Sequence, residues 1–386
     1  MYSTVPWLER LVAHQTVSRD SNLSLIHEVA AFLAERGGHV ELIHNADQRK
    51  ANLLARIGPE REGGIVLSGH TDVVPVDGQP WDSDPFKVSV VDNRLYGRGV
   101  CDMKGFIASA LAQLPDNVDA WRRPLWFALS YDEEVGCVGA PSMIARLAEY
   151  EKVKPLGVVV GEPTSLRSVV GHKGIAAAKT SVRGYEAHSS QMHRGVSAVM
   201  VAARLVAKLE ELGAQLREAK EDARFVPPYS TVHVGMLQGG TAINITARDA
   251  SFIWDIRTIP GQSAREVIEA FERYVEEAVL PDMLAKHAGC SVHTEIIADA
   301  PGLNAPNSRA EQLVMHALGL TQSESYVAYA TEAGQFQSSG FDAVIWGPGS
   351  IDQAHQPNEW IPMNDLEACD RGLTSLYATL GKELSE

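Results

Sequence analysis

Four short apolar stretches of this 386-residue sequence are each followed by side chains that can bind a metal ion or move a proton. The stretches are 63–69, 124–130, 156–161 and 342–347. The residues that follow them are, in chain order, His70, Asp72, Glu133, Glu134, Glu162 and His355. If these stretches form parallel strands, their carboxyl ends meet at one edge of a sheet, where ligands bind in open α/β folds. The sequence therefore predicts one site built from several distant segments.

Imidazole and carboxylate groups form a ligand set for a divalent transition metal, zinc above all. Two imidazoles and three carboxylates are too many for one such ion and suit two ions that share a bridging ligand. Paired ions of this kind hold a hydroxide between them in several hydrolases. Asp102 is isolated in sequence from the other ligands, so it is the candidate for the bridge.

Two short spacings indicate further roles. His70 and Asp72 lie on the same side of an extended segment. Asp72 can then accept the spare N–H of His70 and fix the orientation of its ring. Glu133 and Glu134 are adjacent and diverge in an extended segment. One of them can bind metal while the other acts as a general base toward water.

The elements that position these residues follow from the apolar pattern. The four stretches are rich in β-formers and bounded by Gly, Pro or Asp, which predicts interior strands of a largely parallel sheet with helices on both faces. Apolar positions at helical spacing predict a helical opening over about 5–37. The fold class expected is therefore α/β.

The chain changes texture between about residues 176 and 298. Alternating strands there, with helices near 195–220 and 262–286, predict a smaller α+β domain inserted into the first. The expected division is a zinc-binding catalytic domain over 1–175 and 299–386, and an inserted domain over 176–298.

Composition excludes several classes of partner. The sequence has 34 Lys and Arg against 49 Asp and Glu, a net charge of −15. This balance argues against a nucleic-acid or anionic-membrane surface, because both need positive charge. The sequence has no run of 18 apolar residues, the length that would predict a membrane span. The four scattered cysteines do not form a disulfide pattern, which favours a reducing cytoplasm.

The ordered set of motifs from about residue 65 to 362 resembles a known family. This is the dinuclear-zinc amidohydrolase and metallopeptidase family that includes acetylornithine deacetylase, succinyl-diaminopimelate desuccinylase, aminoacylase and glutamate carboxypeptidases. The motifs that carry the resemblance are GHTDVVP, LYGRGVCDMKG, YDEEVGCVGA, GEPT, AHSS, GGTAINIT and GPGSIDQAHQPNEW.

The resemblance implies a role for each residue of the site. Two zinc ions, with cobalt as a substitute, would be bound by five ligands, which are His70, Asp102, Glu134, Glu162 and His355. His70 and Glu162 would hold one ion, Glu134 and His355 the other, and Asp102 would bridge them. Asp72 would orient His70, and Glu133 would act as general base and acid. The family also implies a cis peptide bond between Asp102 and Met103.

The inserted domain resembles the lid of this family, which also forms the dimer interface, so a homodimer is implied. His188 would reach into the partner subunit's site and support the oxyanion. Asn244 and Arg257 would contact substrate, with Arg257 binding a carboxylate. Lys173 is a further candidate for a substrate contact, although a turn at the domain junction explains it equally well.

The stretches 161–165, 171–174, 331–337 and 347–360 resemble the acetylornithine deacetylase branch more closely than the desuccinylase branch. This implies hydrolysis of the small molecule N2-acetyl-L-ornithine to L-ornithine and acetate, in arginine biosynthesis, by a metal-bridged hydroxide with Glu133 as general base. The enzymatic alternatives are a desuccinylase, another N-acyl amino acid deacylase acting for example on N-acetylcitrulline, a dipeptidase or carboxypeptidase on the same fold, and a metallophosphatase. A catalytically silent zinc-binding protein is the non-enzyme alternative.

Overall fold

The computed structural model describes residues 4–150, 154–319 and 325–382. The chain forms two compact units. Unit 1 takes in the chain up to Gly171, Leu303–Tyr326 and the chain from Thr331 onward, and unit 2 comprises His172–Gly302 with Val327–Ala330. The inserted domain predicted at 176–298 lies within unit 2. The extreme ends of the predicted first domain, 1–3 and 383–386, lie outside the described residues.

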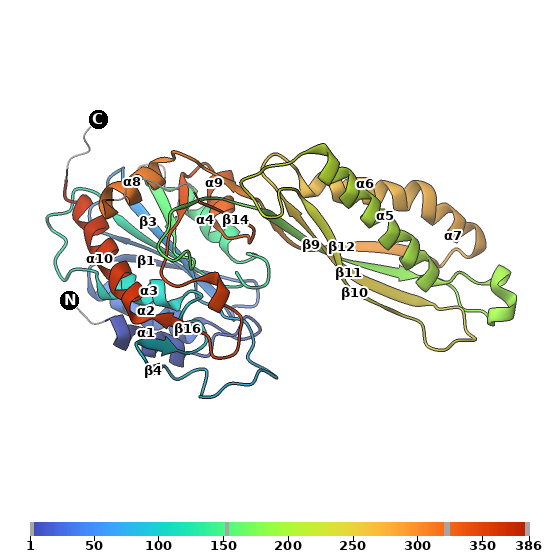
Figure 1. The fold of residues 1–386 in the computed structure, drawn as a ribbon, viewed down its shortest axis with the longest axis horizontal. Coiled ribbons are helices and arrows are strands. Elements are labelled where there is room, and N and C mark those ends of the chain that lie inside the picture. The colour runs from blue at the N-terminus through green and yellow to red at the C-terminus, as the bar shows by residue number, and fades with distance from the viewer. Residues whose placement is uncertain (1–3, 151–153, 320–324, 383–386) are drawn as a thin grey trace. The chain divides into compact units, whose positions relative to one another are not determined.

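Unit 1 contains a nine-stranded sheet in the order β1-β2-β6-β3-β7-β15-β8-β13, with β14 paired to β8 (Figure 1). The strands are β1 (His39–His44), β2 (Ala51–Ile57), β3 (Ile65–His70), β6 (Leu125–Ser130), β7 (Gly157–Val160), β8 (Val169–His172), β13 (Leu303–Asn304), β14 (Ser325–Val327) and β15 (Ala343–Ile345). The four strands predicted from the apolar stretches are neighbours and pair in parallel. Strand β2 joins both β1 and β6 antiparallel, so the sheet is parallel at its centre.

Helices cover both faces of this sheet, as predicted. Along β6, Leu125, Phe127 and Leu129 point into a large core, while Trp126 and Ala128 are buried on the opposite face. The helices that contribute to the large core are α1 (Thr4–Ala13), α2 (Leu23–Glu35), α3 (Lys104–Ala112), α8 (Arg309–Leu318) and α10 (Met363–Thr379). The helices α4 (Ala140–Ala148) and α9 (Ala333–Ser338) contact each other and pack against β2 and β15, respectively.

The helical opening predicted over 5–37 consists of two helices in the structure, α1 and α2. Between them, Val17 forms a parallel β-bridge with Val73, immediately beyond β3. The side chain of Asn22 bonds to the backbone of Ala51 at both its carbonyl and its N–H. These tertiary bonds replace the helical ones and bring Ser18 beside Asp72.

A small antiparallel sheet pairs one strand that precedes Asp102 in the chain with one that follows His355. It has the order β16-β5-β4 and consists of β4 (Ser89–Val91), β5 (Arg94–Tyr96) and β16 (Trp360–Pro362). The short helix η4 (Ile351–Gln353) precedes His355, and β16 follows it. Pairing of β16 with β5 therefore brings the two loops that carry Asp102 and His355 to the same region.

Unit 2 is an antiparallel sheet of order β10-β11-β9-β12 covered on one face by helices (Figure 1). Its elements are β9 (Gly174–Arg183), η2 (Ser189–Arg194), α5 (Ala198–Ala219), β10 (Thr231–Gly239), β11 (Asp249–Thr258), α6 (Ala264–Tyr274), η3 (Val275–Val279), α7 (Leu280–Lys286) and β12 (Ser291–Ala300). Alternate residues of β11, among them Phe252, Trp254 and Ile256, form a second core with α5 and α6. The helix predicted at 262–286 is the run α6, η3 and α7.

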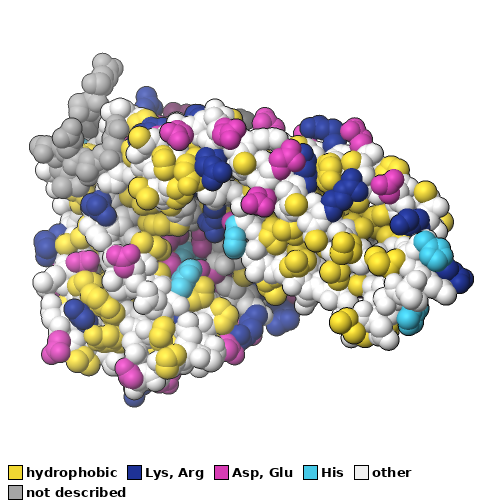
Figure 2. All heavy atoms as spheres, turned by 45° about the vertical axis from the view of Figure 1, so that its right-hand side comes forward, with side chains coloured by type: hydrophobic (Ala, Val, Ile, Leu, Met, Phe, Trp, Pro, Cys, Tyr) yellow, Lys and Arg dark blue, Asp and Glu magenta, His cyan; other side chains and the backbone are white. Residues whose placement is uncertain are grey.

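Charged and apolar side chains are mixed on the surface. On the face that Figure 2 shows, acidic and basic side chains are interspersed with apolar ones. Net negative charge of this scattered kind promotes solubility and does not define a partner. Within the described ranges, none of the helices combines the length and hydropathy that a bilayer crossing requires.

Candidate metal centre

The predicted ligands of unit 1 lie where strands and loops converge. His70 is the last residue of β3, Glu134 follows β6, and Glu162 follows β7. Because β6, β3 and β7 are parallel neighbours, these residues leave the sheet at the same edge. Asp102 lies in the loop before α3, and His355 lies between η4 and β16.

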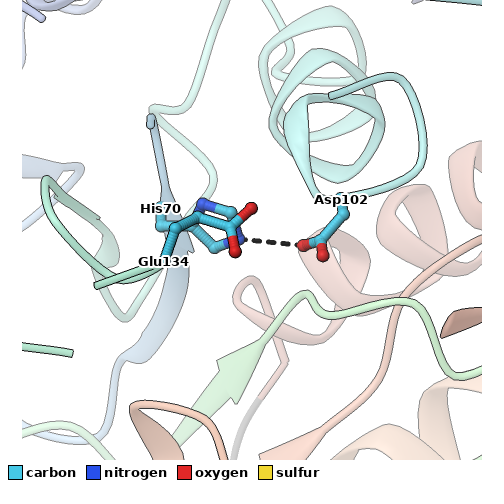
Figure 3. Close-up of side chains that lie close together, drawn as sticks. All are labelled: His70, Asp102 and Glu134. Atoms are coloured by element: carbon cyan, nitrogen blue, oxygen red, sulfur yellow. Dashed lines mark hydrogen bonds and ion pairs between the residues drawn. The ribbon is translucent and has the colours of Figure 1, made fainter. Parts of the chain in front are cut away.

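Asp102 lies between the two histidines. Its Oδ1 is 2.9 Å from His70 Nε2, and its Oδ2 is 3.3 Å from His355 Nε2. His355 Nε2 is also 2.8 Å from Oε2 of Glu134. Figure 3 shows the carboxylate of Asp102 facing the side chains of His70 and Glu134. One carboxylate whose two oxygens face two different imidazoles has the arrangement required of a bridging ligand.

A second group of potential ligands overlaps the first. The donor atoms of His70, Glu133 and Glu162 lie within 4.8 Å of one another, as do those of His70, Asp102 and Glu134. His70 Nε2 and Glu162 Oε1 are 3.9 Å apart. The structure therefore brings together all five predicted ligands and places Glu133 beside them.

Asp72 orients His70 differently from the prediction. His70 Nδ1 lies 2.9 Å from the backbone carbonyl oxygen of Asp72, whereas the Asp72 carboxylate is 3.8 Å away. The carboxylate instead accepts the backbone N–H groups of Glu133, at 3.1 Å, and Glu134, at 3.3 Å, and the hydroxyl of Ser18, at 2.7 Å. Asp72 thus holds the strand-end histidine with its main chain and the glutamate pair with its side chain.

Crowding of buried carboxylates changes the protonation of the centre. Burial, and repulsion from neighbouring carboxylates, raises the pKa of Glu133 to about 8 and that of Glu134 to about 7, while burial likewise raises the pKa of Glu162 well above its ordinary value. Hydrogen bonds to Asp102 and Glu134 raise the pKa of His355 to about 10. Burial opposes ionisation of Asp102, but hydrogen bonds from both histidines outweigh it and lower its pKa.

The donor set fits two divalent cations. Two imidazoles and three carboxylates converge, one carboxylate faces both imidazoles, and negative charge concentrates where burial disfavours it. Divalent cations would supply the compensating charge. His70 and Glu162 would hold one ion, Glu134 and His355 the other, with Asp102 shared between them.

The loop that carries Glu133 has support that the sequence did not reveal. The thiol of Cys137 is 3.1 Å from Oε1 of Glu133, and the side chain of Gln335 donates to the carbonyl of Cys137 at 2.8 Å. Glu332 is buried nearby, bonds to the hydroxyl of Ser68, and has a pKa raised by burial to about 7. Gln335 and Glu332 belong to the stretch 331–337. Its resemblance to the acetylornithine deacetylase branch was the only sequence feature that pointed to these two residues.

Unit 2 contains His188, predicted to support the oxyanion, and the three residues predicted to bind substrate, Asn244, Arg257 and Lys173. His188 is exposed and its Nδ1 is 2.8 Å from the hydroxyl of Ser190, while Asn244 accepts the backbone N–H of Ser189 with its carbonyl oxygen. Arg257 Nε lies 3.4 Å from Asp255. Lys173 is buried, and its ammonium donates to the carbonyl oxygens of Pro227 and Tyr229, each at 2.7 Å. This favours the structural alternative for Lys173.

Two smaller expectations are confirmed. The peptide bond between Asp102 and Met103 is cis. All four cysteines are free and buried, so no disulfide contributes to the described fold.

The fold and the cluster together define a metal-dependent hydrolase, and the chain belongs to peptidase family M20/M25/M40, whose sequence model matches residues 66–379. Among its relatives is an acetylornithine deacetylase from Myxococcus xanthus, 36% identical over 382 residues that cover 96% of each chain. Another acetylornithine deacetylase, from Photorhabdus laumondii, is 35% identical and covers 89% of this chain and 87% of the relative. The chain is thus a hydrolase of an amide bond.

Solved structures share the fold at low sequence identity. An M20 family metallo-carboxypeptidase from Sulfolobus solfataricus superposes with a TM-score of 0.79 at 18% identity, covering 99% of this chain and 100% of the other. Human carnosine dipeptidase 1 gives 0.71 at 16%, covering 98% and 96%. A protein from Bacillus subtilis described as a dinuclear metal binding peptidase gives 0.65 at 14%, covering 97% and 96%.

Proposed function

We propose that the chain hydrolyses N-acyl amino acids, and that its principal substrate is N2-acetyl-L-ornithine, which yields L-ornithine and acetate. The single observation that carries the chemistry is the position of Asp102 between His70 and His355, with Glu133 beside them. The choice of substrate is supported by the sequence identity to acetylornithine deacetylases, which extends over most of the chain. Release of ornithine would place the enzyme in arginine biosynthesis.

Glu133 is proposed as the group that moves protons. It would take a proton from the attacking water and later deliver one to the departing amine. Without metal, burial raises its pKa to about 8; nearby cations would lower this value and so favour the carboxylate that accepts the proton. Two zinc ions at the centre, or cobalt as a substitute, would polarise the acyl carbonyl and acidify the attacking water.

The residues of unit 2 are proposed to recognise substrate. Arg257 would bind the α-carboxylate, since a guanidinium matches that group in two hydrogen bonds. Asn244 would contact the acyl amino acid. His188 is exposed, which supports its proposed action in the centre of a second subunit, where it would stabilise the developing oxyanion. The enzyme would then be a homodimer through unit 2. Its free cysteines support a cytoplasmic location.

A substrate screen tests this proposal. Metal-loaded enzyme is given N-acetyl, N-succinyl and N-formyl amino acids, including N-acetylornithine, N-acetylcitrulline and succinyl-diaminopimelate, beside a dipeptide panel. We expect the highest kcat/KM with N-acetylornithine, with acetate and ornithine formed in equal amounts. The variant Glu133→Gln is the negative control in every reaction.

The other substrates decide between named alternatives. A higher kcat/KM with dipeptides would favour the peptidase function that the fold shares with human carnosine dipeptidase 1. A preference for succinyl-diaminopimelate would favour a desuccinylase, and a preference for N-acetylcitrulline a different deacetylase. Each of these results would overturn the proposed principal substrate.

A further inference from the structure

The loops that carry Asp102 and His355 are joined by a network of polar side chains, in which Glu359 and Arg98 are buried and Gln79 is partly exposed. Both carboxylate oxygens of Glu359 accept hydrogen bonds in this network. Its Oε1 accepts the backbone N–H groups of Cys101, at 2.9 Å, and Asp102, at 3.1 Å. Its Oε2 accepts the N–H of Gly99 at 3.0 Å and the guanidinium of Arg98 at 2.7 Å. Glu359 thus fixes the main chain of the loop that carries Asp102.

Arg98 extends the network toward Gln79. It is buried to the same degree as Glu359, each side chain being 1% exposed. Its Nη2 donates to Oε1 of Gln79 at 2.6 Å, and Trp81 Nε1 donates to the same oxygen at 3.1 Å. Arginine and tryptophan side chains donate hydrogen bonds and do not accept them. The amide of Gln79 must therefore present its oxygen to these two groups.

The orientation of this amide determines what reaches His355. With its oxygen committed, Gln79 presents its NH2 group to the carbonyl oxygen of His355, 3.0 Å away. His355 needs such support, because its side chain is 53% exposed and its φ of 62° lies in the left-handed region, which side chains other than glycine disfavour.

We infer that Gln79 and Arg98 are positioning residues that set the affinity of the ion held by Glu134 and His355. This rests on the dinuclear centre proposed above. The network forms hydrogen bonds with the backbone of Asp102 and of His355. It does not include the two ligands that only the other ion would have. His70 and Glu162 come instead from the ends of β3 and β7. Loss of the network should therefore weaken one ion more than the other.

The test uses Gln79→Glu, which keeps the shape of the side chain. A carboxylate still accepts from Arg98 and Trp81, but it cannot donate to the His355 carbonyl. Metal-free wild type and variant are titrated with zinc against a chromophoric chelator, so that binding is measured without substrate. We expect binding of one ion to weaken about 10- to 100-fold, as for other residues that support a metal ligand, and binding of the other to stay unchanged.

Two further variants make the result specific. His355→Ala identifies the affected binding step, because it should weaken the same one. Gln312→Glu is the matched control, since Gln312 also donates its amide to a main-chain carbonyl, that of Asn307, at 3.1 Å and on α8. It should bind both ions as the wild type does. The unfolding midpoint of each variant, measured without metal, reports whether it folds.

Two outcomes would overturn the inference while leaving the proposed function in place. In one, Gln79→Glu binds both ions with wild-type affinity. In the other, both steps weaken equally. Wild-type protein that takes up fewer than two ions would instead overturn the dinuclear centre, and the inference with it.

Discussion

The carboxylate of Asp72 accepts the backbone N–H of Glu133 across 3.1 Å, and it accepts that of Glu134 across 3.3 Å. A residue placed two positions after one expected ligand therefore fixes the main chain of the proposed general base and of another expected ligand. Its own backbone carbonyl orients His70. Asp72 thus connects the segments that follow β3 and β6.

We expect Asp72→Asn to lower kcat about 10- to 100-fold, because a neutral amide is a weaker acceptor for the three donors that Asp72 serves and one end of it cannot accept at all. Steady-state kinetics with N-acetylornithine and metal analysis measure the effect. Asp77→Asn is the control, since Asp77 is an exposed aspartate paired with Arg19. Wild-type kcat in Asp72→Asn would show that the carboxylate is dispensable.

Glu133→Gln should bind two metal ions and lose about 10²- to 10⁴-fold in kcat, because the amide keeps the size of the side chain and cannot take a proton. Metal content is measured by elemental analysis beside the kinetics. If the variant keeps full turnover, Glu133 is not the base. If it loses its metal, Glu133 is a ligand as its proximity to His70 and Glu162 would then indicate.

Cys137→Ala should reduce kcat roughly five-fold, the effect of about 1 kcal/mol for one lost hydrogen bond to Glu133. Cys137→Ser retains a donor and should recover most of the loss, with KM unchanged in both variants. Cys369→Ala removes another fully buried thiol, on α10, and should lower stability without changing kcat. Equal kcat in the alanine and serine variants would exclude a role for the hydrogen bond.

His188→Ala should lower kcat about 10²- to 10³-fold without changing metal content, since it would remove the proposed donor to the oxyanion. If His188 acts in the partner subunit's site, mixing this variant with Glu133→Gln restores activity in hybrid dimers, which have one intact site of two. Random exchange of equal amounts gives about a quarter of wild-type activity. No recovery, with exchange demonstrated, would place His188 in its own subunit's site or outside catalysis.

The metal-free protein should lose stability as pH rises from about 5 to 8, and above pH 7 the buried Lys104, whose pKa burial lowers to about 7, offsets part of the loss. Burial raises the pKa of Glu133 to about 8 from 4.5, and hydrogen bonds raise that of His355 to about 10 from 6.5. Between these values the folded protein holds protons that the unfolded chain has released, so the free energy of unfolding falls by about 1.4 kcal/mol per pH unit for each such proton.

Urea unfolding with a chelator measures this dependence, which should be steepest between about pH 6.5 and 7, where the windows of Glu133, Glu134, Glu332 and His355 overlap. Zinc should stabilise the protein more at the higher pH, because it replaces the retained protons. Stability of the metal-free protein that rises over this range would contradict the protonation described for the centre.

The central sheet and the set of converging side chains could be predicted because their causes are local. An apolar β-rich run predicts a buried strand, and parallel strands bring the residues after them to one edge. His70, Glu134 and Glu162 follow this rule directly. The break between α1 and α2 could not be predicted in this way, because it depends on the bridge from Val17 to Val73.

The polar support of the centre was beyond sequence reasoning for a similar reason. Gln79 and the carbonyl oxygen it contacts are 276 residues apart in the chain. Whether His70 uses the carboxylate or the carbonyl of Asp72 depends on the turn after β3, not on the spacing of the two residues. Arg98 and Glu359 are charged residues whose burial as a pair appears only in the folded structure.

The position of unit 2 within the chain also affects the order in which the centre is built during translation. The ribosome synthesises four of the proposed site residues, His70, Asp102, Glu134 and Glu162, before it makes most of unit 2. It adds His355 only afterwards. With the proposed ligands, a nascent chain can complete the set for one ion early. The second ion must wait until almost the whole polypeptide has emerged, so a truncated translation product would lack the dinuclear centre.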